Sequence, residues 1–346
     1  MSAGPLVLRA GTAGWAAGPG GTAGPGGTPG PDRTPHPDGR AGDGVVQAIT
    51  PESAGWSYSG LTVLALAPGG RHRFGGGADE ALVLPLAGAV RVEVDGVTVD
   101  LLGRRDVFAG PTDAVFLGRG SRATLVAPDD APARVAVATA RATRTLPSRR
   151  LAARDARVEL RGAGAMSRRV TNYTLGTDVD VDRLLVCEVL TPGGNWSSYP
   201  PHKHDVHAED ERPLEEIYYF EVAAAPAEVG AAPGVGYHRV YASGKPVDVL
   251  AEVRTGDAVL VPHGYHGPSM AAPGYDLYYL NVMAGPADDG CWLATDDPAH
   301  AWVRATWEGQ PVDPRLLPDG AAPRSAGAAP ARPAGPATAR VPEEAP

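Results

Sequence analysis

The residues of this chain with the clearest capacity for chemistry are histidines that fall in two short clusters. His202 and His204 are separated by one residue, and His266 lies further along the chain. On a β-strand, residues i and i+2 point to the same face, so the first pair can present two imidazoles to one side. Glu216 begins the next apolar run, and its carboxylate can join the imidazoles if that run pairs with the first.

Three imidazoles and one carboxylate form a ligand set for a divalent metal ion. Such a set holds Zn²⁺, Fe²⁺ or Mn²⁺ without choosing strongly among them.

Two other histidines need separate interpretations: His207 lies in a polar stretch and is expected to be solvated, whereas His238 faces either a cavity or solvent. The first half of the chain contains no His-x-His, so we expect no equivalent metal site there.

Strands are the elements that must position these side chains. Apolar and polar residues alternate with a period of two in many short runs, among them 61–67, 89–94, 134–138, 183–190, 217–222, 259–262 and 275–283. This alternation is typical of half-buried strands. Helical periodicity is scarce apart from short turns near 298–307. The sequence therefore predicts an all-β fold.

A weak internal repeat indicates that the β architecture is duplicated. The segment Leu66–Gly70 matches Leu190–Gly194, and Asp106–Pro111 resembles Asp257–Pro262. Many short strands with turn signals between them favour a sandwich or jelly-roll barrel in each half.

Glycine and proline mark the boundaries of the folded region. The chain of 346 residues has 45 Gly and 35 Pro, and they are concentrated toward the ends. We expect residues 1–44 to form a disordered Gly/Pro-rich tail and residues 309–346 a disordered Ala/Pro-rich tail. Between them, a charged linker at 148–160 separates an N-terminal domain (45–147) from a C-terminal domain (161–308).

Charge and hydropathy exclude several classes of partner. There are 31 basic and 40 acidic side chains, which give a net charge of −9 and argue against nucleic acid. No apolar run approaches the ~18–20 residues of a membrane helix, and no signal peptide is evident. We expect a cytoplasmic protein with reduced Cys187 and Cys291 and a small-molecule substrate, and a homo-oligomer is left open.

The second half of the chain resembles a known family. The His-x-His, the glutamate, the later Gly256–Pro262 segment and the histidine after it resemble the cupin superfamily. More specifically, the chain is similar to the 5-deoxy-glucuronate isomerase family of myo-inositol catabolism. The segments that carry this resemblance are Gly194–Asp205, Leu214–Tyr219, Arg239–Tyr241, Val261–His266 and Gly274–Pro286. It covers about residues 45–308, weakly in the first half and closely in the second.

The resemblance implies a bicupin, in which two jelly-roll barrels follow one another and only the C-terminal one binds metal. Its ligands would be His202, His204, Glu216 and His266. A related isomerase acting on 5-keto-4-deoxyuronate shares a three-His, one-Glu zinc site, so Zn²⁺ is expected here, with Fe²⁺ and Mn²⁺ as alternatives. The implied reaction is the aldose–ketose isomerisation of 5-deoxy-D-glucuronate to 5-dehydro-2-deoxy-D-gluconate.

Such an isomerisation moves a proton from C2 to C1 and needs a group that carries it. Tyr218, His263 and Lys203 are the candidate catalytic residues, and alternation places Tyr218 on the same strand face as Glu216. The substrate carboxylate needs a cation or hydrogen-bond donors, for which Arg239 and Lys203 are the candidates.

Other functions remain compatible with the same ligands. A metal-dependent oxygenase uses an equivalent site to hold Fe²⁺, and a related uronate isomerase differs only in its substrate. A non-catalytic sugar sensor is a third possibility, but the chain shows no basic helix-turn-helix to receive its signal.

Overall fold

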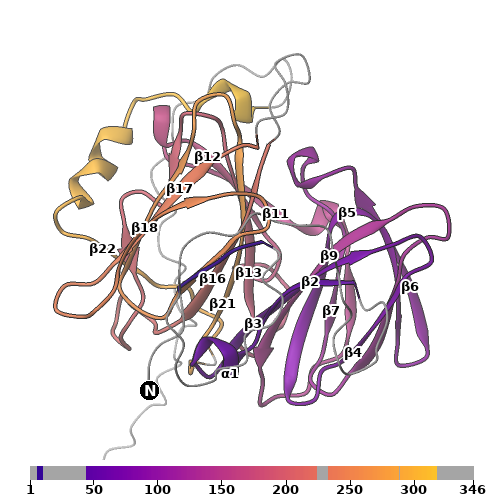
Figure 1. Cartoon of the computed structure of the whole chain (residues 1–346). Coiled ribbons are helices and arrows are strands. Elements are labelled where there is room, and N and C mark those ends of the chain that lie inside the picture. The colour runs from indigo at the N-terminus through magenta and orange to yellow at the C-terminus, as the bar shows by residue number, and fades with distance from the viewer. Residues whose placement is uncertain (1–5, 11–43, 224–232, 288, 318–346) are drawn as a thin grey trace, which may run out of the picture.

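Antiparallel β-sheets dominate the regular structure of the computed structural model (Figure 1), which describes residues 6–10, 44–223, 233–287 and 289–317. Within these ranges the strands are arranged in three sheets, and helices are short. The predicted all-β class is confirmed. The helical turns expected near 298–307 correspond to the 3₁₀-helix η5 (Ala301–Trp307).

The first half of the described chain forms one nine-stranded sheet. A long strand, β5, is shared by two parts of this sheet, because it pairs with β6 and β8 toward its end and with β7 and β9 nearer its start. The nine strands are β2 (Val45–Ile49), β3 (Ser59–Leu66), β4 (Arg71–Gly75), β5 (Asp79–Val94), β6 (Val97–Arg104), β7 (Ala114–Leu117), β8 (Arg122–Val126), β9 (Ala133–Arg141) and β10 (Arg149–Leu151). The four-residue helix α1 (Pro51–Ala54) and the turn η1 (Val107–Ala109) lie between them.

The second half, joined by residues 7–8 from the N-terminal segment, forms two sheets that pack around a common core. The seven-stranded sheet has the order β1 (Val7–Leu8), β19 (Ala258–Val261), β16 (Glu215–Val222), β21 (Leu277–Ala284), β13 (Leu185–Thr191), β12 (Arg168–Asn172) and β11 (Arg157–Arg161). The six-stranded sheet contains β18 (Asp248–Val253), β17 (Gly236–Tyr241), β20 (Tyr265–Ala271), β15 (His202–Lys203), β22 (Thr295–Asp296) and β14 (Trp196–Ser197). Short 3₁₀ turns are η2 (Ala153–Asp155), η3 (Gly164–Met166) and η6 (Pro314–Leu316).

The central strands of the seven-stranded sheet, β19, β16, β21 and β13, are buried on both faces, which explains why apolar residues predominate along them. On β16, Ile217 and Tyr219 pack into a core shared with the nine-stranded sheet, whereas Tyr218 and Phe220 pack toward the six-stranded sheet. This alternation, with a period of two, fixes which side chains can reach the interior of the second half.

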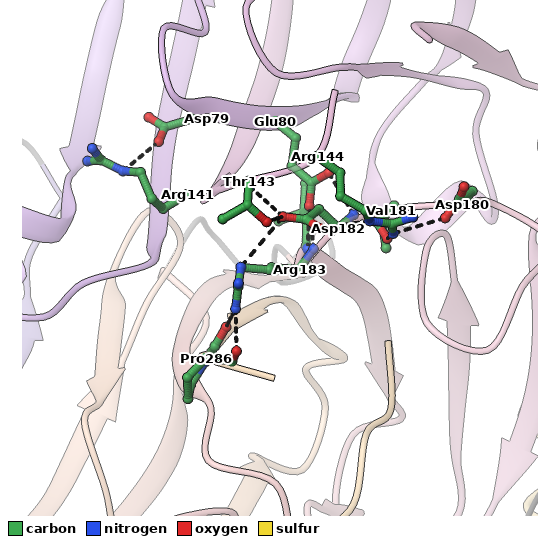
Figure 2. A network of polar contacts seen from close by, with 12 residues as sticks. Asp79, Glu80, Arg141, Thr143, Arg144, Asp180, Val181, Asp182, Arg183 and Pro286 are labelled. Carbon is green, nitrogen blue, oxygen red and sulfur yellow. Dashed lines mark hydrogen bonds and ion pairs between the residues drawn. The ribbon is translucent and has the colours of Figure 1, made fainter. Parts of the chain in front are cut away.

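Polar contacts also join the two halves (Figure 2). The buried Glu80 carboxylate accepts hydrogen bonds from three consecutive backbone N–H groups at 182–184, over 2.7–2.9 Å. Asp182 in turn accepts from the Thr143 backbone N–H at 2.6 Å and pairs with Arg144 at 2.9 Å. The contact between the halves is therefore specific as well as hydrophobic.

The segment expected to be a linker at 148–160 belongs largely to the sheets. Its first part forms β10 on the nine-stranded sheet and its last part forms β11 on the seven-stranded sheet, which leaves only a short connection around η2. Charged composition misled the prediction here, because both are edge strands whose arginines reach ion-pair partners, as Arg150 does with Asp113.

The N-terminal segment also differs from the predicted tail of 1–44. Residues 7 and 8 form β1 at the edge of the seven-stranded sheet, where Val7 faces Val259. Leu260 donates its backbone N–H to the Leu6 carbonyl at 2.8 Å, and Arg9 pairs with the buried Asp257 at 2.8 Å. Residues up to 317 at the other end are also placed, and the remainder of both predicted tails lies outside the described residues.

Deletion of residues 1–10 is expected to destabilise the protein by about 2 kcal/mol. The deletion removes partly buried Leu6, Val7 and Leu8 from the sheet edge and exposes apolar surface beneath them. Thermal unfolding of the truncated chain measures the effect, and deletion of residues 1–5 alone is the control that keeps β1. Equal melting temperatures for the two truncations would contradict a stabilising role for β1.

Among the residues that the structure describes, no helix combines the length and the apolar composition needed to cross a bilayer.

Candidate metal centre

Three of the four predicted ligands converge inside the second half of the chain. His204 follows β15, Glu216 is on β16 and His266 is on β20, and each is at most 2 % exposed. One potential ligand atom from each side chain lies within 4.8 Å of the other two. Among the residues that the structure describes, this is the only such group of three.

The two histidines are oriented so that their Nε2 atoms face the carboxylate. Glu216 Oε2 lies 2.9 Å from His204 Nε2 and 3.1 Å from His266 Nε2. The Nδ1 atoms are turned outward to backbone carbonyls, that of Leu214 at 2.9 Å for His204 and that of Gly264 at 3.1 Å for His266. Carbonyl contacts of this kind fix the ring and leave Nε2 as the ligand.

The donor set fits a divalent cation. The Nε2 atom of His266 is buried and lies 3.1 Å from Glu216 Oε2, without good hydrogen-bond geometry to that or any other described residue. A buried imidazole nitrogen aimed at a carboxylate and a second imidazole is a costly arrangement unless something binds there. Nitrogen and carboxylate oxygen donors suit Zn²⁺, Fe²⁺ and Mn²⁺ alike.

His202, the fourth predicted ligand, lies beside this group. Its ring centroid is 4.4 Å from that of His266 and 6.5 Å from that of His204. The His202 ring also packs on Trp292 in a T-shaped arrangement, with 5.6 Å between the ring centroids. Burial, together with the neighbouring His266, lowers the pKa of His202 well below its usual range. The imidazole is therefore neutral at pH 7, the form that ligates a metal.

The carboxylate of the group is held in its charged form. Burial alone would raise the pKa of Glu216, but the charges and hydrogen bonds of His266 and His204 hold that pKa far below its usual range. Burial alone would lower the pKa of His204, but its hydrogen bond to Glu216 raises that pKa above the usual value. The group thus keeps an anionic oxygen in an apolar interior, as a cation site requires.

A cluster of hydroxyl groups lines the interior next to the histidines. The Ser198 hydroxyl lies 3.2 Å from the Tyr218 hydroxyl and 3.1 Å from the Tyr279 hydroxyl. The Tyr218 ring centroid is 6.0 Å from that of His266. Ser198 has a φ of 46°, in the left-handed region that serine rarely adopts. Sequence reasoning predicted Tyr218 but missed Ser198 and Tyr279, although Ser198 lies just before the His-x-His segment.

His238, whose orientation the sequence left open, faces the interior. It is fully buried, its Nδ1 lies 2.7 Å from the Ser269 hydroxyl, and its ring centroid is 4.4 Å from that of Tyr218. Burial lowers the pKa of His238 to about 3, so its ring is neutral. His207, in contrast, is exposed, as expected.

The structure does not bring all of the other predicted residues to the group. The Lys203 ammonium is bound by both oxygens of Glu211, at 2.8 and 2.7 Å. Arg239 lies on the opposite face of β17 from His238, pairs with Asp248 and stacks over Tyr241. His263 is partly buried, and burial lowers its pKa.

The fold and this group together define a β-sheet protein of the cupin type with a candidate metal centre. A fold-level match is oxalate decarboxylase from Lactobacillus farciminis, with a TM-score of 0.53 over 74 % of this chain and 85 % of that one at 12 % identity. That likeness concerns the fold alone.

The chain belongs to the KduI/IolB family, whose model matches residues 34–303. It is 41 % identical over 266 residues to a protein of Geobacillus kaustophilus named 5-deoxy-glucuronate isomerase, covering 75 % of this chain and 91 % of that one. A protein of the same name from Bacillus subtilis strain 168 is 36 % identical over 264 residues, covering 75 % and 92 %. An IolB-like protein from Salmonella typhimurium LT2 has a solved structure with a TM-score of 0.68 and 34 % identity, covering 76 % of this chain and 96 % of that one.

Proposed function

We propose that this protein is a metal-dependent aldose–ketose isomerase that converts 5-deoxy-D-glucuronate to 5-dehydro-2-deoxy-D-gluconate. The observation that carries the proposal is the convergence of His204, Glu216 and His266, with His202 beside them, in a chain whose relatives bear the name of that isomerase. We further propose that the two halves are tandem cupin barrels, of which only the second is catalytic. Zn²⁺ as the metal and a cytoplasmic location remain predictions.

The isomerisation removes a proton from C2 and returns one to C1. It also removes the proton of the C2 hydroxyl and places one on the C1 oxygen. His202, His204, Glu216 and His266 would hold the cation. When bound, a divalent cation supplies Lewis-acid stabilisation of the negative charge that develops on the substrate oxygens. Burial of the three converging side chains excludes water from the reacting atoms.

Among the candidate catalytic residues, Tyr218 has the best position. Burial raises the pKa of Tyr218 well above its usual range, so its hydroxyl keeps its proton at pH 7. Ser198 and Tyr279 hold that hydroxyl in a chain of three, along which protons can be exchanged. We propose that Tyr218 donates a hydrogen bond to a substrate oxygen. Lys203 is bound by Glu211 and His263 is not among the converging residues, so neither is assigned a role in the reaction.

A proton NMR time course with 5-deoxy-D-glucuronate in D₂O tests the proposed reaction. The aldehyde signal should disappear and a ketose should appear, with deuterium incorporated at C1. A chelator should block the conversion, and added Zn²⁺ should restore it. If metal-replete protein produces no ketose, the proposed reaction is wrong.

Replacement of Tyr218 by Phe is expected to lower kcat about 100-fold, the usual loss when one acid–base group is removed. Metal content should not change, because Tyr218 is not among the converging ligand atoms. Steady-state kinetics and elemental analysis measure both quantities. Tyr219→Phe is the matched control, since Tyr219 lies in the core between the halves and should leave kcat within about 3-fold. Equal kcat values for the two variants would exclude the role of Tyr218.

A further inference from the structure

Arg168 is a buried cation on the interior side of the second half. It begins β12 and lies two residues before Val170, which packs in the core facing the six-stranded sheet. Because alternate residues of a strand share a face, Arg168 points into the same interior. Its neighbour Arg169 lies on the opposite face, where Thr171 is paired with Glu188. Arg168 is 9 % exposed.

No carboxylate of the described residues forms an ion pair with this guanidinium. Its Nη1 donates to the Met166 carbonyl at 3.1 Å, and the guanidinium carbon lies 5.5 Å from the Trp307 ring centroid. Two further arginines act on its charge: Arg161 shares Glu159 with Arg157, and Arg304 pairs with Asp296. Positive charge is therefore in excess around Arg168, which has no carboxylate of its own.

An unneutralised buried cation is costly, and the interior offers it little compensation. Burial lowers the pKa of Arg168 to about 10, which leaves the side chain charged at pH 7. A carbonyl and an aromatic face satisfy only part of a group with five N–H donors. An anion bound beside the guanidinium would offset this cost.

The position of Arg168 connects it with the candidate metal centre. Its charge acts on the Tyr279 hydroxyl, which is bonded to Ser198 and through it to Tyr218, beside His266. Arg304 also acts electrostatically on both Arg168 and His202. Side-chain packing links the same residues: Arg161 faces Arg168 across the β11–β12 pair, its guanidinium carbon lies 5.9 Å from the Trp292 ring centroid, and that ring packs on His202 at 5.6 Å.

We propose that Arg168 binds the carboxylate of the sugar-acid substrate while the aldehyde end of the same molecule is held at the candidate metal centre. This assignment rests on the proposed function and deepens it, because it names the residue that selects an acid over a neutral sugar. A guanidinium fork matches a carboxylate with two parallel hydrogen bonds, which accounts for an arginine at this position.

The experiment compares two substrates with three variants. 5-Deoxy-D-glucuronate carries the carboxylate, and 5-deoxy-D-glucose has a hydroxymethyl group in its place. Arg168→Met should lower kcat/KM for the acid about 50-fold, mainly through KM, the loss expected for a charge-assisted hydrogen bond. The same variant should change kcat/KM for the neutral sugar by less than about 3-fold and leave metal content intact. Arg168→Lys should fall between wild type and Arg168→Met.

Arg169→Met is the matched control, because it removes the same charge one residue away on the opposite strand face. It should retain the preference for the acid. If Arg168→Met folds but keeps that preference, the assignment is wrong. If Arg168→Met does not fold, Arg168→Lys tests the assignment. A wild-type KM and a wild-type preference for the acid in that variant would overturn the proposed contact between the guanidinium and the substrate carboxylate.

A second readout separates this assignment from the proposed reaction. Calorimetric titration with D-glucuronate, and with D-glucose as the neutral probe, measures binding without turnover. If the wild type converts neither deoxy sugar but binds D-glucuronate in a manner that Arg168→Met abolishes, the reaction fails and the carboxylate site stands. Equal D-glucuronate affinity in wild type and Arg168→Met would overturn the site even where turnover is observed.

Discussion

Replacing Glu216 by Gln is expected to reduce bound metal to near zero and to lower kcat/KM about 1,000-fold or more. The substitution preserves shape but removes the one anionic oxygen that lies between His204 and His266. A neutral amide offers a divalent cation a much weaker ligand, and its NH₂ group can face the imidazoles instead. Loss of the metal removes its stabilisation of charge on the substrate, which is commonly the largest contribution to catalysis.

Elemental analysis of the purified variant and turnover at saturating Zn²⁺ measure the two effects. Glu215→Gln is the matched control, because Glu215 lies on the opposite face of β16 and accepts hydrogen bonds from backbone N–H groups at 57–59. That control should keep its metal and its activity while losing about 1–3 kcal/mol of stability. A Glu216→Gln protein with full metal content and normal turnover would exclude the proposed ligand role.

Part of the candidate metal centre could be predicted from the sequence. Alternation along extended chain indicates which way His204 and Glu216 point. The expected pairing of their strands is not observed, because β15 and β16 lie in different sheets and meet across the interior, where β20 brings His266. The face of Tyr218 followed from the same alternation. Alternation alone could not show whether His238 or Arg239 faces the interior, since it says only that the two side chains point in opposite directions. In the structure His238 is the one that faces the interior.

Contacts that depend on distant segments could not be predicted. The sequence made Lys203 a candidate catalytic residue. In the structure, Glu211 from the loop that follows β15 binds its ammonium group. The ordering of residues 6–10 depends on the unpaired edge of β19, which no local pattern in the tail reveals. The burial of Arg168 depends in the same way on a distant segment, since η5 covers its side chain with Trp307.

The junction between the halves depends on a buried ion pair that the sequence also did not reveal. Arg104 of β6 and Glu188 of β13 are about 95 % buried and form a two-pronged contact. Tyr278 and Tyr173 donate their hydroxyls to Glu188 at 2.6 and 3.1 Å, and Arg104 donates to the Pro85 carbonyl at 3.1 Å. Burial alone would lower the pKa of Arg104, but the charge of Glu188 raises it above the usual value.

Glu188→Gln is therefore expected to lower the free energy of unfolding by about 3–5 kcal/mol, because it leaves the Arg104 charge buried without a counter-charge. Denaturant unfolding of the metal-bound protein measures the loss. Glu93→Gln is the control, since its partner Arg71 and Glu93 itself are both exposed, and that pair should contribute less than about 1 kcal/mol.

The double variant Arg104→Met/Glu188→Met distinguishes two explanations of the same loss. If an orphaned charge is responsible, removal of both partners should recover most of the stability lost in Glu188→Gln, since apolar side chains of similar volume can replace a buried pair at little cost. If the hydrogen bonds from Tyr173 and Tyr278 are what matter, the double variant should be no more stable than the single one. A loss below about 1 kcal/mol in Glu188→Gln would show that the pair stabilises the junction no more than a surface salt bridge does.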